Sequence, residues 1–274
     1  MKLKPFTVLI PWLLVLFATV VEAKALAFPT IQVVPIQDSA TEREYELYIK
    51  LPEHYDTKAD NKYPVIYIVD ALWNIEVISG SIEYFIDNVI LVGISWEKGL
   101  PPQQSRMRDY TPIPYRGTKF PHPTGKADEH LAFLKHDVFK YVESQYKADP
   151  KNRSFYGFSV GGTFGSYILL TQPNTFKNYI LGSPATLFGG QFIHEQQFIK
   201  QKIPESIDAN VFVSVGSEEK LKEIEHAISL VHFLKSNKAN SPQVEFKVIE
   251  SADHGRAFPI SAIQSLIWLA AHSK

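Results

Sequence analysis

The chain has 274 residues, 45% hydrophobic and 13% aromatic, which is enough apolar material for one substantial core and unlike a disordered or low-complexity protein. The net charge of −1 favours neither nucleic acid nor an anionic membrane surface as a partner. The sequence contains no cysteine, which excludes disulfides and thiolate metal sites.

Residues 1–23 have the layout of a secretory signal peptide. Two lysines precede an uncharged, mostly apolar stretch over 5–21, and small residues follow it. Cleavage after Ala23 fits best, with Ala25 as the second choice. It would leave 26 basic and 28 acidic residues, a net charge of −2. The alternative is an uncleaved membrane anchor, but Pro11 interrupts the run, whose apolar part is shorter than the ~20 residues of a spanning helix.

We therefore expect a periplasmic or secreted protein with no stable membrane insertion after cleavage, in which residues 24–274 form a single domain. Segments 30–36 and 42–52 alternate in polarity and predict a hairpin. Six continuous apolar runs follow, and continuous apolarity indicates strands buried on both faces, as in a parallel sheet. These runs cover residues 63–70, 88–96, 152–158, 178–184, 210–217 and 243–251.

Helical patterns lie between these runs, at 74–86, 126–146, 160–171, 221–237 and 258–272. Strand alternating with helix is typical of an α/β fold. The expected architecture is a mostly parallel central sheet with an antiparallel N-terminal hairpin and helices on both faces.

Two connections are longer than the ~2 to 6 residues usual in such folds, which predicts binding loops or lids. Residues 97–125 carry six prolines and three arginines. Residues 185–208 carry Phe188, Phe192 and Phe198. We expect loop insertions at both places.

One serine lies in the sequence GFSVG (157–161), which fits the pattern G-x-S-x-G. The string alone is weak evidence, but an apolar strand ends just before Ser159 and a helical pattern begins at Val160, so the serine would occupy a tight strand-to-helix turn. Side chains at Gly157 and Gly161 would collide with neighbouring backbone in such a turn. The alternative is a glycine-rich helix start. We expect Ser159 to be a nucleophile.

A serine nucleophile needs a base, and His254 is the best placed of nine histidines, just after the last predicted strand with Gly255 behind it. The order nucleophile, acid, base along an α/β-hydrolase chain requires a histidine here. The acid should follow a strand between the two, and VFVSVGSEEK (211–220) supplies Glu219, which we prefer, and Glu218. A dyad without an acid also remains open.

Two backbone N–H groups would complete an oxyanion hole. Val160, directly after the nucleophile, supplies one. The second comes from the loop in VIYIVDALW (65–73), where Leu72 is preferred and Trp73 is the alternative.

Six segments together are far more specific than G-x-S-x-G: YPVIYIVDALW, RMRDYTP, TGKADEHLAFLKHDVFKYVESQYKADPKNRSFYGFSVGG, GSPATLF, VGSEE and ADHG. Through them, roughly residues 30–272 resemble the "Putative esterase" branch of the α/β hydrolases. That branch includes siderophore trilactone esterases, esterase D-like enzymes and mycolyltransferases.

The resemblance implies an α/β-hydrolase fold, an oxyanion donor at Leu72 and an acid at Glu219 in a G-x-x-E pattern that starts at Gly216. Ala71 departs from the glycine of the family's LDGL-like segment, so this loop is expected to sit slightly differently. The layout is most similar to the periplasmic trilactone esterases.

Four residues are expected to contact substrate: Arg106, Arg108, Trp73 and Phe188. The arginines of RMRDYTP (106–112) would attract an anionic ligand such as a ferric catecholate complex, although Arg106 could instead pair with Asp109 and pin the loop. Phe188 directly follows GSPATL and would line an acyl or aromatic pocket, whereas Phe192 and Phe198 are expected to be packed.

The sequence thus predicts an exported serine carboxylic-ester hydrolase that works through an acyl-enzyme on a small-molecule ester, with siderophore trilactones as candidate substrates. No cofactor or metal is expected, since there is no Walker sequence, no H-E-x-x-H and no cysteine. The alternatives are an acyltransferase of the same fold and a non-catalytic ligand-binding homologue. The sequence does not predict an oligomeric state.

Overall fold

The computed structural model describes residues 30–58, 60–115, 120–185, 206–236 and 242–272. The predicted signal peptide at 1–23 and the predicted pocket residue Phe188 lie outside these ranges. Among the described residues, no helix has both the length and the apolar character that a membrane crossing requires.

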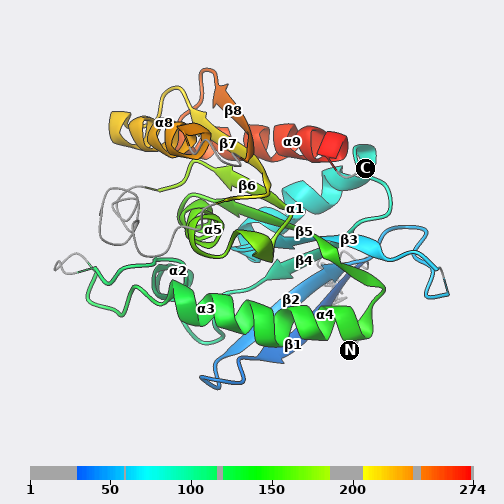
Figure 1. Cartoon of the computed structure of the whole chain (residues 1–274). Helices are drawn as coiled ribbons and strands as arrows, with labels where there is room; N and C mark the ends of the chain where they lie inside the picture. The colour runs from blue at the N-terminus through cyan, green and yellow to red at the C-terminus, as the bar shows by residue number, and fades with distance from the viewer. Residues whose placement is uncertain (1–29, 59, 116–119, 186–205, 237–241, 273–274) are drawn as a thin grey trace, which may run out of the picture.

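The described strands form one eight-stranded sheet in the order β1-β2-β4-β3-β5-β6-β7-β8 (Figure 1). The two pairs β1–β2 and β2–β4 are antiparallel, and the remaining pairs are parallel. All eight predicted strands are present, and the mostly parallel sheet with an antiparallel hairpin is confirmed. Their bounds are β1 Ile31–Gln37, β2 Glu44–Lys50, β3 Tyr63–Ile68, β4 Ile90–Ile94, β5 Ala148–Phe158, β6 Asn178–Gly182, β7 Asn210–Gly216 and β8 Gln243–Ile249.

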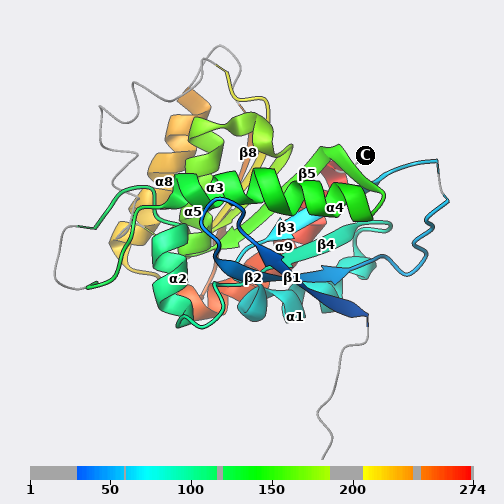
Figure 2. The ribbon, with the colours of Figure 1, turned by 90° about the horizontal axis from the view of Figure 1, so that it is seen from below.

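The helices cover both faces of the sheet, as predicted. One core contains side chains from α1, α9 and one face of the central strands, and a second contains side chains from α3, α4, α5, α8 and the other face. Figure 2 shows α1 and α3–α4 on opposite sides of the strands. The bounds are α1 Ala71–Ser81, α2 Pro102–Asp109, α3 Ala127–Phe133, α4 Phe139–Gln145, α5 Val160–Thr171, α8 Leu221–Ser236 and α9 His254–His272, with short turns η1 Ile82–Tyr84, η2 Leu134–Val138 and η3 Pro173–Thr175.

Four features of these helices differ from the prediction. The first helix, predicted over 74–86, is α1 over Ala71–Ser81, followed by the short turn η1. The segment 97–125, predicted as a loop insertion, contains the helix α2. The predicted helix over 126–146 is interrupted by a π-helical turn, η2. The last helix begins at His254 instead of 258 and includes Pro259, which the sequence pattern had placed at its start.

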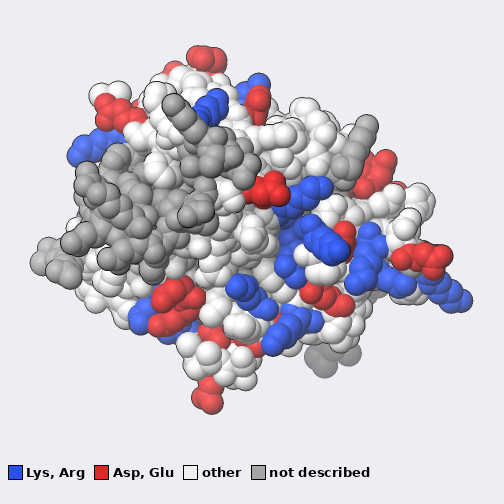
Figure 3. Space-filling view, viewed as in Figure 1, with Lys and Arg blue, Asp and Glu red and all other residues white. Residues whose placement is uncertain are grey.

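The surface carries charges of both signs. Lys and Arg gather toward the right of the face in Figure 3, but Asp and Glu lie among them. This mixture agrees with the near-neutral net charge of −1.

Candidate active site

Ser159 lies in the tight turn between β5 and α5, where its backbone has φ 59° and ψ −122°. A non-glycine residue rarely adopts a positive φ, and such strain persists when the surroundings hold it. Here the Ser159 N–H donates to Gly182 O at 2.8 Å, while the Ser159 carbonyl accepts from the N–H groups of Thr163 and Ala185 at 3.0 and 3.1 Å. The turn is therefore held from both sides, and the serine is half-buried.

Glycines allow the backbones around this turn to approach closely. A Cβ on Gly157 would lie 2.4 Å from Gly161 O, and one on Gly162 would lie 2.8 Å from Gly182 O. A Cβ on Gly161 would lie 2.9 Å from the side chain of Val69, at the end of β3. The two glycines of G-x-S-x-G thus lie where a side chain would collide with neighbouring atoms.

His254 and Glu219 form a hydrogen-bonded pair, with 2.6 Å between His254 Nδ1 and Glu219 Oε2. Glu219 follows β7 and His254 opens α9 after β8, so the carboxyl ends of two neighbouring strands bring them together. The imidazole ring contacts the ring of Phe158, the residue before Ser159, with 5.0 Å between centroids. Within the described residues, no hydrogen bond joins the imidazole to Ser159 Oγ.

The Glu219 carboxylate is buried, and its second oxygen is also occupied. Oε1 accepts from the Ser183 hydroxyl at 2.6 Å and from the Gly216 N–H at 2.8 Å. Burial raises the pKa of this carboxyl, but the hydrogen bonds from His254, Ser183 and Gly216 outweigh that effect and hold the pKa below its usual range. Glu219 is therefore ionised at neutral pH.

Among the described residues, Glu218, the alternative acid, forms no hydrogen bond or ion pair with His254. Its side chain is exposed and lies 3.6 Å from the guanidinium of Arg256. The structure therefore gives the histidine a single glutamate partner among the two that the sequence offered.

The two expected oxyanion donors lie at the starts of α1 and α5. Neither Leu72 N–H nor Val160 N–H donates to a backbone oxygen of the described chain. The Trp73 N–H, the alternative donor, is committed to Asp70 O at 2.9 Å. The two loops touch where Val69 meets Gly161. The geometry thus favours Leu72 over Trp73.

Arg106 and Arg108 were expected to contact substrate, but the structure gives both arginines internal partners. Arg106 is buried and forms a two-pronged ion pair with Asp70, its Nε and Nη2 lying 3.0 and 2.7 Å from the carboxylate oxygens. Arg108 is also buried and pairs with Asp109 and Glu97. Both arginines thus take part in ion pairs at α2, and their expected contact with substrate stays a prediction. The alternative pairing of Arg106 with Asp109 is not formed.

Trp73 is the expected substrate contact that the structure leaves open, with 51% of the residue exposed. Its ring packs edge-on against Trp96, with 4.6 Å between centroids, and lies against the guanidinium of Arg106 at 4.9 Å. It offers a rigid aromatic surface one residue from the predicted oxyanion donor Leu72.

Two polar residues at this site were not predicted. Asp70 binds Arg106, and Ser183 donates to Glu219. The signal for Asp70 was a single carboxylate at the end of an otherwise apolar strand, VIYIV (65–69). Ser183 had no comparable signal, because its role depends on a contact between β6 and β7.

One group of side chains in the described part of the chain has the spacing of metal ligands. Potential ligand atoms of Glu219, Glu223 and His254 all lie within 4.8 Å of one another. The hydrogen bond between Glu219 and His254 already uses two of these groups, so a cation would have to compete with it.

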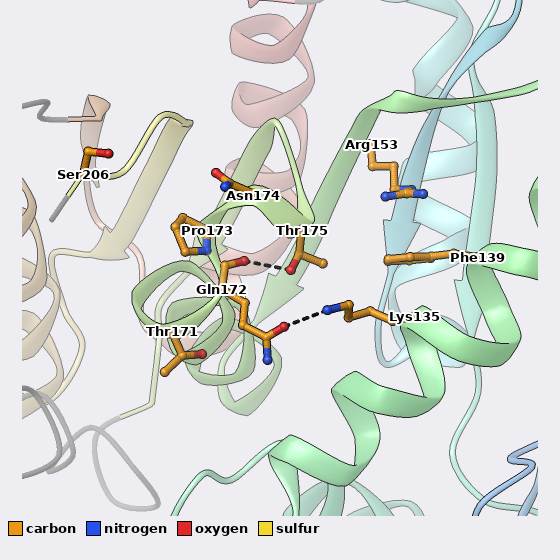
Figure 4. A pocket seen from close by; sticks show the side chains of 9 residues that line it. All are labelled: Lys135, Phe139, Arg153, Thr171, Gln172, Pro173, Asn174, Thr175 and Ser206. Carbon is orange, nitrogen blue, oxygen red and sulfur yellow. Dashed lines mark hydrogen bonds between the residues drawn. The ribbon is translucent and has the colours of Figure 1, made fainter. Parts of the chain in front are cut away.

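A separate hollow of about 740 Å³ opens at the far end of α5 (Figure 4). Thr171 and Gln172, where α5 ends, line it, whereas Ser159 precedes the other end of this helix. Twelve helical residues span about 18 Å, so the hollow is distinct from the serine site.

Most of the chain is matched by a family model. The model described as "Putative esterase" matches residues 39–268. The chain belongs to the Putative esterase family. Membership in this family supports a carboxylic ester hydrolase.

Two curated relatives and one solved structure are similar to this esterase. The ferri-bacillibactin esterase BesA of Bacillus subtilis is 25% identical over 265 residues, 89% of this chain and 91% of BesA. The siderophore triacetylfusarinine C esterase of Aspergillus fumigatus is 27% identical over 191 residues, 64% of each chain. The crystal structure of the BES protein from Bacillus cereus has a TM-score of 0.76 at 22% identity, covering 92% of this chain and 99% of that one. That likeness shows the α/β-hydrolase fold.

Proposed function

We propose that this esterase is a serine carboxylic-ester hydrolase that works through an acyl-enzyme. The observation that carries the proposal is the pair of His254 and Glu219 beside the strained turn of Ser159. A buried carboxylate bound to Nδ1 of an imidazole fixes the tautomer that leaves Nε2 able to accept a proton.

In the proposed reaction, Ser159 Oγ attacks the ester carbonyl while His254 Nε2 takes the hydroxyl proton. The negative oxygen of the tetrahedral intermediate is bound by the N–H groups of Val160 and Leu72, and the N-terminus of α5 adds positive potential. The carbon–oxygen bond to the alcohol then breaks, and His254 gives the proton to the leaving alkoxide. Water repeats the sequence on the acyl-enzyme and releases the acid.

We propose siderophore esters as the substrate class. BesA, named as a ferri-bacillibactin esterase, aligns over most of both chains, and the Aspergillus fumigatus relative is named as an esterase of another siderophore. The exposed ring of Trp73 beside Leu72 supports an aromatic or bulky ester. With Arg106 and Arg108 buried, the proposal does not depend on recognition of a negative charge by these two side chains.

The serine mechanism is tested by fluorophosphonate labelling of purified protein. We expect the label on the peptide that contains Ser159, no label in Ser159→Ala, and slow labelling in His254→Ala. A label on another residue, or none on wild type, would contradict the mechanism and favour a non-catalytic homologue.

The substrate class is tested by comparing a ferric tricatecholate trilactone with a short linear acyl ester. We expect faster turnover of the trilactone, measured as kcat/KM, with linear catecholate esters as products. Addition of sugars as alternative acceptors distinguishes hydrolysis from acyl transfer, because a transferase would esterify their hydroxyl groups. Turnover of the short ester alone would contradict the siderophore assignment.

We propose that the protein acts after export, with residues 1–23 removed. The support is the charged start, apolar stretch and small residues of the leader. The intact mass of protein recovered outside the bacterial cytoplasm should correspond to a chain that begins at Lys24. Recovery of the full-length chain in the membrane fraction would contradict this and favour the anchor.

A further inference from the structure

Asp70 lies two residues before the proposed oxyanion donor Leu72, and every polar group it has is occupied. Its backbone is left-handed, with φ 54° and ψ 43°. Its carbonyl accepts from the N–H groups of Trp73 and Asn74 at 2.9 and 3.2 Å, and its own N–H lies 3.4 Å from the Tyr110 hydroxyl. The conformation of Asp70 therefore sets the direction in which the Leu72 N–H points.

The Asp70 carboxylate accepts three hydrogen bonds that fix this conformation. Arg106 donates to both oxygens, at 3.0 and 2.7 Å, and Trp96 Nε1 donates to Oδ1 at 2.7 Å. Both side chains of the ion pair are almost fully buried, 7% exposed for Arg106 and 1% for Asp70. Two-pronged arginine–carboxylate pairs add geometric definition as well as energy.

The same pair touches the other half of the proposed oxyanion hole. A Cβ on Gly161 would lie 3.3 Å from Asp70 Oδ2, so the carboxylate packs against the residue that follows Val160. Tyr110, directly after α2, stacks on Phe164 of α5, with 5.4 Å between ring centroids. The buried cluster of Asp70, Arg106 and Tyr110 thus contacts both turns that supply the N–H donors.

The Arg106 guanidinium stays charged at neutral pH. Burial opposes the charged form of Arg106, but the adjacent Asp70 carboxylate outweighs this and raises the pKa of the guanidinium. The ring of Trp73 covers the guanidinium at 4.9 Å. Asp70 accepts from two of the five N–H groups of Arg106, and the residue is only 6% exposed, which favours a positioning role over an open substrate contact.

We infer that Arg106 is a positioning residue for the oxyanion hole: through Asp70 it holds the Leu72 N–H in the place that the tetrahedral intermediate requires. The inference rests on the proposed function, because it assigns a role to Arg106 within that mechanism. It gives the helix α2, inserted in the segment 97–125, a part in turnover through a buried side chain.

The test compares Arg106→Lys with wild type in turnover of an ester and in binding of a trifluoromethyl ketone. The ketone forms a tetrahedral adduct with a serine nucleophile, so its affinity reports the oxyanion hole directly. Lysine keeps the charge but loses the two-pronged pairing. Since the loss of one oxyanion donor costs about 10²- to 10³-fold in turnover, a displaced donor should lower kcat by about 10- to 10²-fold. KM should change little, and ketone affinity should fall by a factor similar to that of kcat.

Arg153→Lys is the matched control. Arg153 also pairs with a glutamate, its Nε lying 2.8 Å from Glu143 Oε1, and it also lies over an aromatic ring, Phe139, at 4.5 Å. Figure 4 shows this arginine above the Phe139 ring in the hollow at the far end of α5. The control should lose thermal stability without a change in kcat or ketone affinity.

Trp96→Phe provides a second test if Arg106→Lys does not fold. It removes one hydrogen bond to Asp70 and keeps most of the buried ring, so it should lower kcat and ketone affinity together, by less than Arg106→Lys.

Folded variants with unchanged kcat and ketone affinity would overturn the inference, as would a rise in KM alone, which would indicate a substrate contact. If wild type shows no Ser159-dependent turnover, the proposed function fails and the inference fails with it. Normal wild-type turnover with unaffected variants would overturn the inference alone.

Discussion

Glu219 is a buried carboxylate with three hydrogen-bond donors, one of which is the imidazole of His254. Replacing Glu219 with Gln should lower kcat by roughly 10²- to 10⁴-fold, since an amide can hold the imidazole in the wrong tautomer. Glu218→Gln is the control, because its exposed carboxylate contacts Arg256 and not the histidine. Steady-state kinetics of both variants checks this. Equal losses in the two would contradict the assignment of Glu219.

Ser183 affects the same carboxylate in a way that depends on pH. Ser183→Ala removes the 2.6 Å hydrogen bond to Glu219 Oε1, which should lower the free energy of unfolding at neutral pH by about 1.5–3 kcal/mol. The Glu219 pKa is depressed in the folded protein, so the stabilisation is complete above its ordinary value of 4.5 and is lost as pH falls through the depressed value.

The difference in unfolding free energy between wild type and Ser183→Ala should therefore shrink in acid. Urea unfolding at several pH values measures it. A difference independent of pH would show that the hydroxyl does not act on the ionised carboxylate.

At the residue scale, the sequence offered Ser159, His254 and Glu219 as candidates because each follows a recognisable strand in the order that the proposed mechanism requires. It did not predict the partners of Arg106. A charged side chain can be paired internally or exposed to ligand, and only the three-dimensional contact with Asp70, 36 residues away, distinguishes the two.

At the scale of elements, the turn from β5 into α5 depends on the absence of side chains. Gly157→Ala would place a Cβ 2.4 Å from Gly161 O, a backbone atom that cannot move without displacing α5. We expect a loss of about 1–3 kcal/mol in unfolding free energy, or more, and a loss of activity.

Gly80→Ala is the control for this substitution, because a Cβ there meets nothing within 4 Å. Gly80 is exposed in α1, and alanine should stabilise the helix by about 0.5–1 kcal/mol. Thermal unfolding and kinetics of both variants test the pair. A well-folded, active Gly157→Ala would contradict the account of the turn.

The strands of the parallel part of the sheet were predictable because continuous short runs of β-branched and aromatic residues are typical of buried strands. The helix α2 was not, since five of its eight residues, Ser105–Asp109, are buried and four of those are polar or charged. The buried side chains of α2 form ion pairs instead of an apolar stripe, so hydrophobic periodicity does not predict a helix there. The prolines around it favour a loop instead. The start of α9 was misplaced for a similar reason, because a helix containing Pro259 reads as one that begins there.

At the scale of the whole molecule, two hydrophobic cores enclose the sheet and leave its carboxyl ends to form the site. Ser159, Glu219 and His254 follow three of these strands, as expected for an open α/β sheet, where ligands bind beyond the carboxyl ends. The shared edge follows from the parallel direction of these strands, which the alternation of strand and helix predicted. The identity of the substrate does not follow from the sheet, because specificity depends on side chains in the segments that connect the strands.

The acyl-enzyme on Ser159 is the central claim, and intact-mass measurement of protein quenched during turnover of a slow ester tests it most directly. The account predicts a mass increase equal to the acyl group, located on the peptide that contains Ser159, and one equivalent of alcohol released in a burst. Ser159→Ala should show neither. An ester cleaved without such an adduct, or cleaved equally well by Ser159→Ala, would contradict the account.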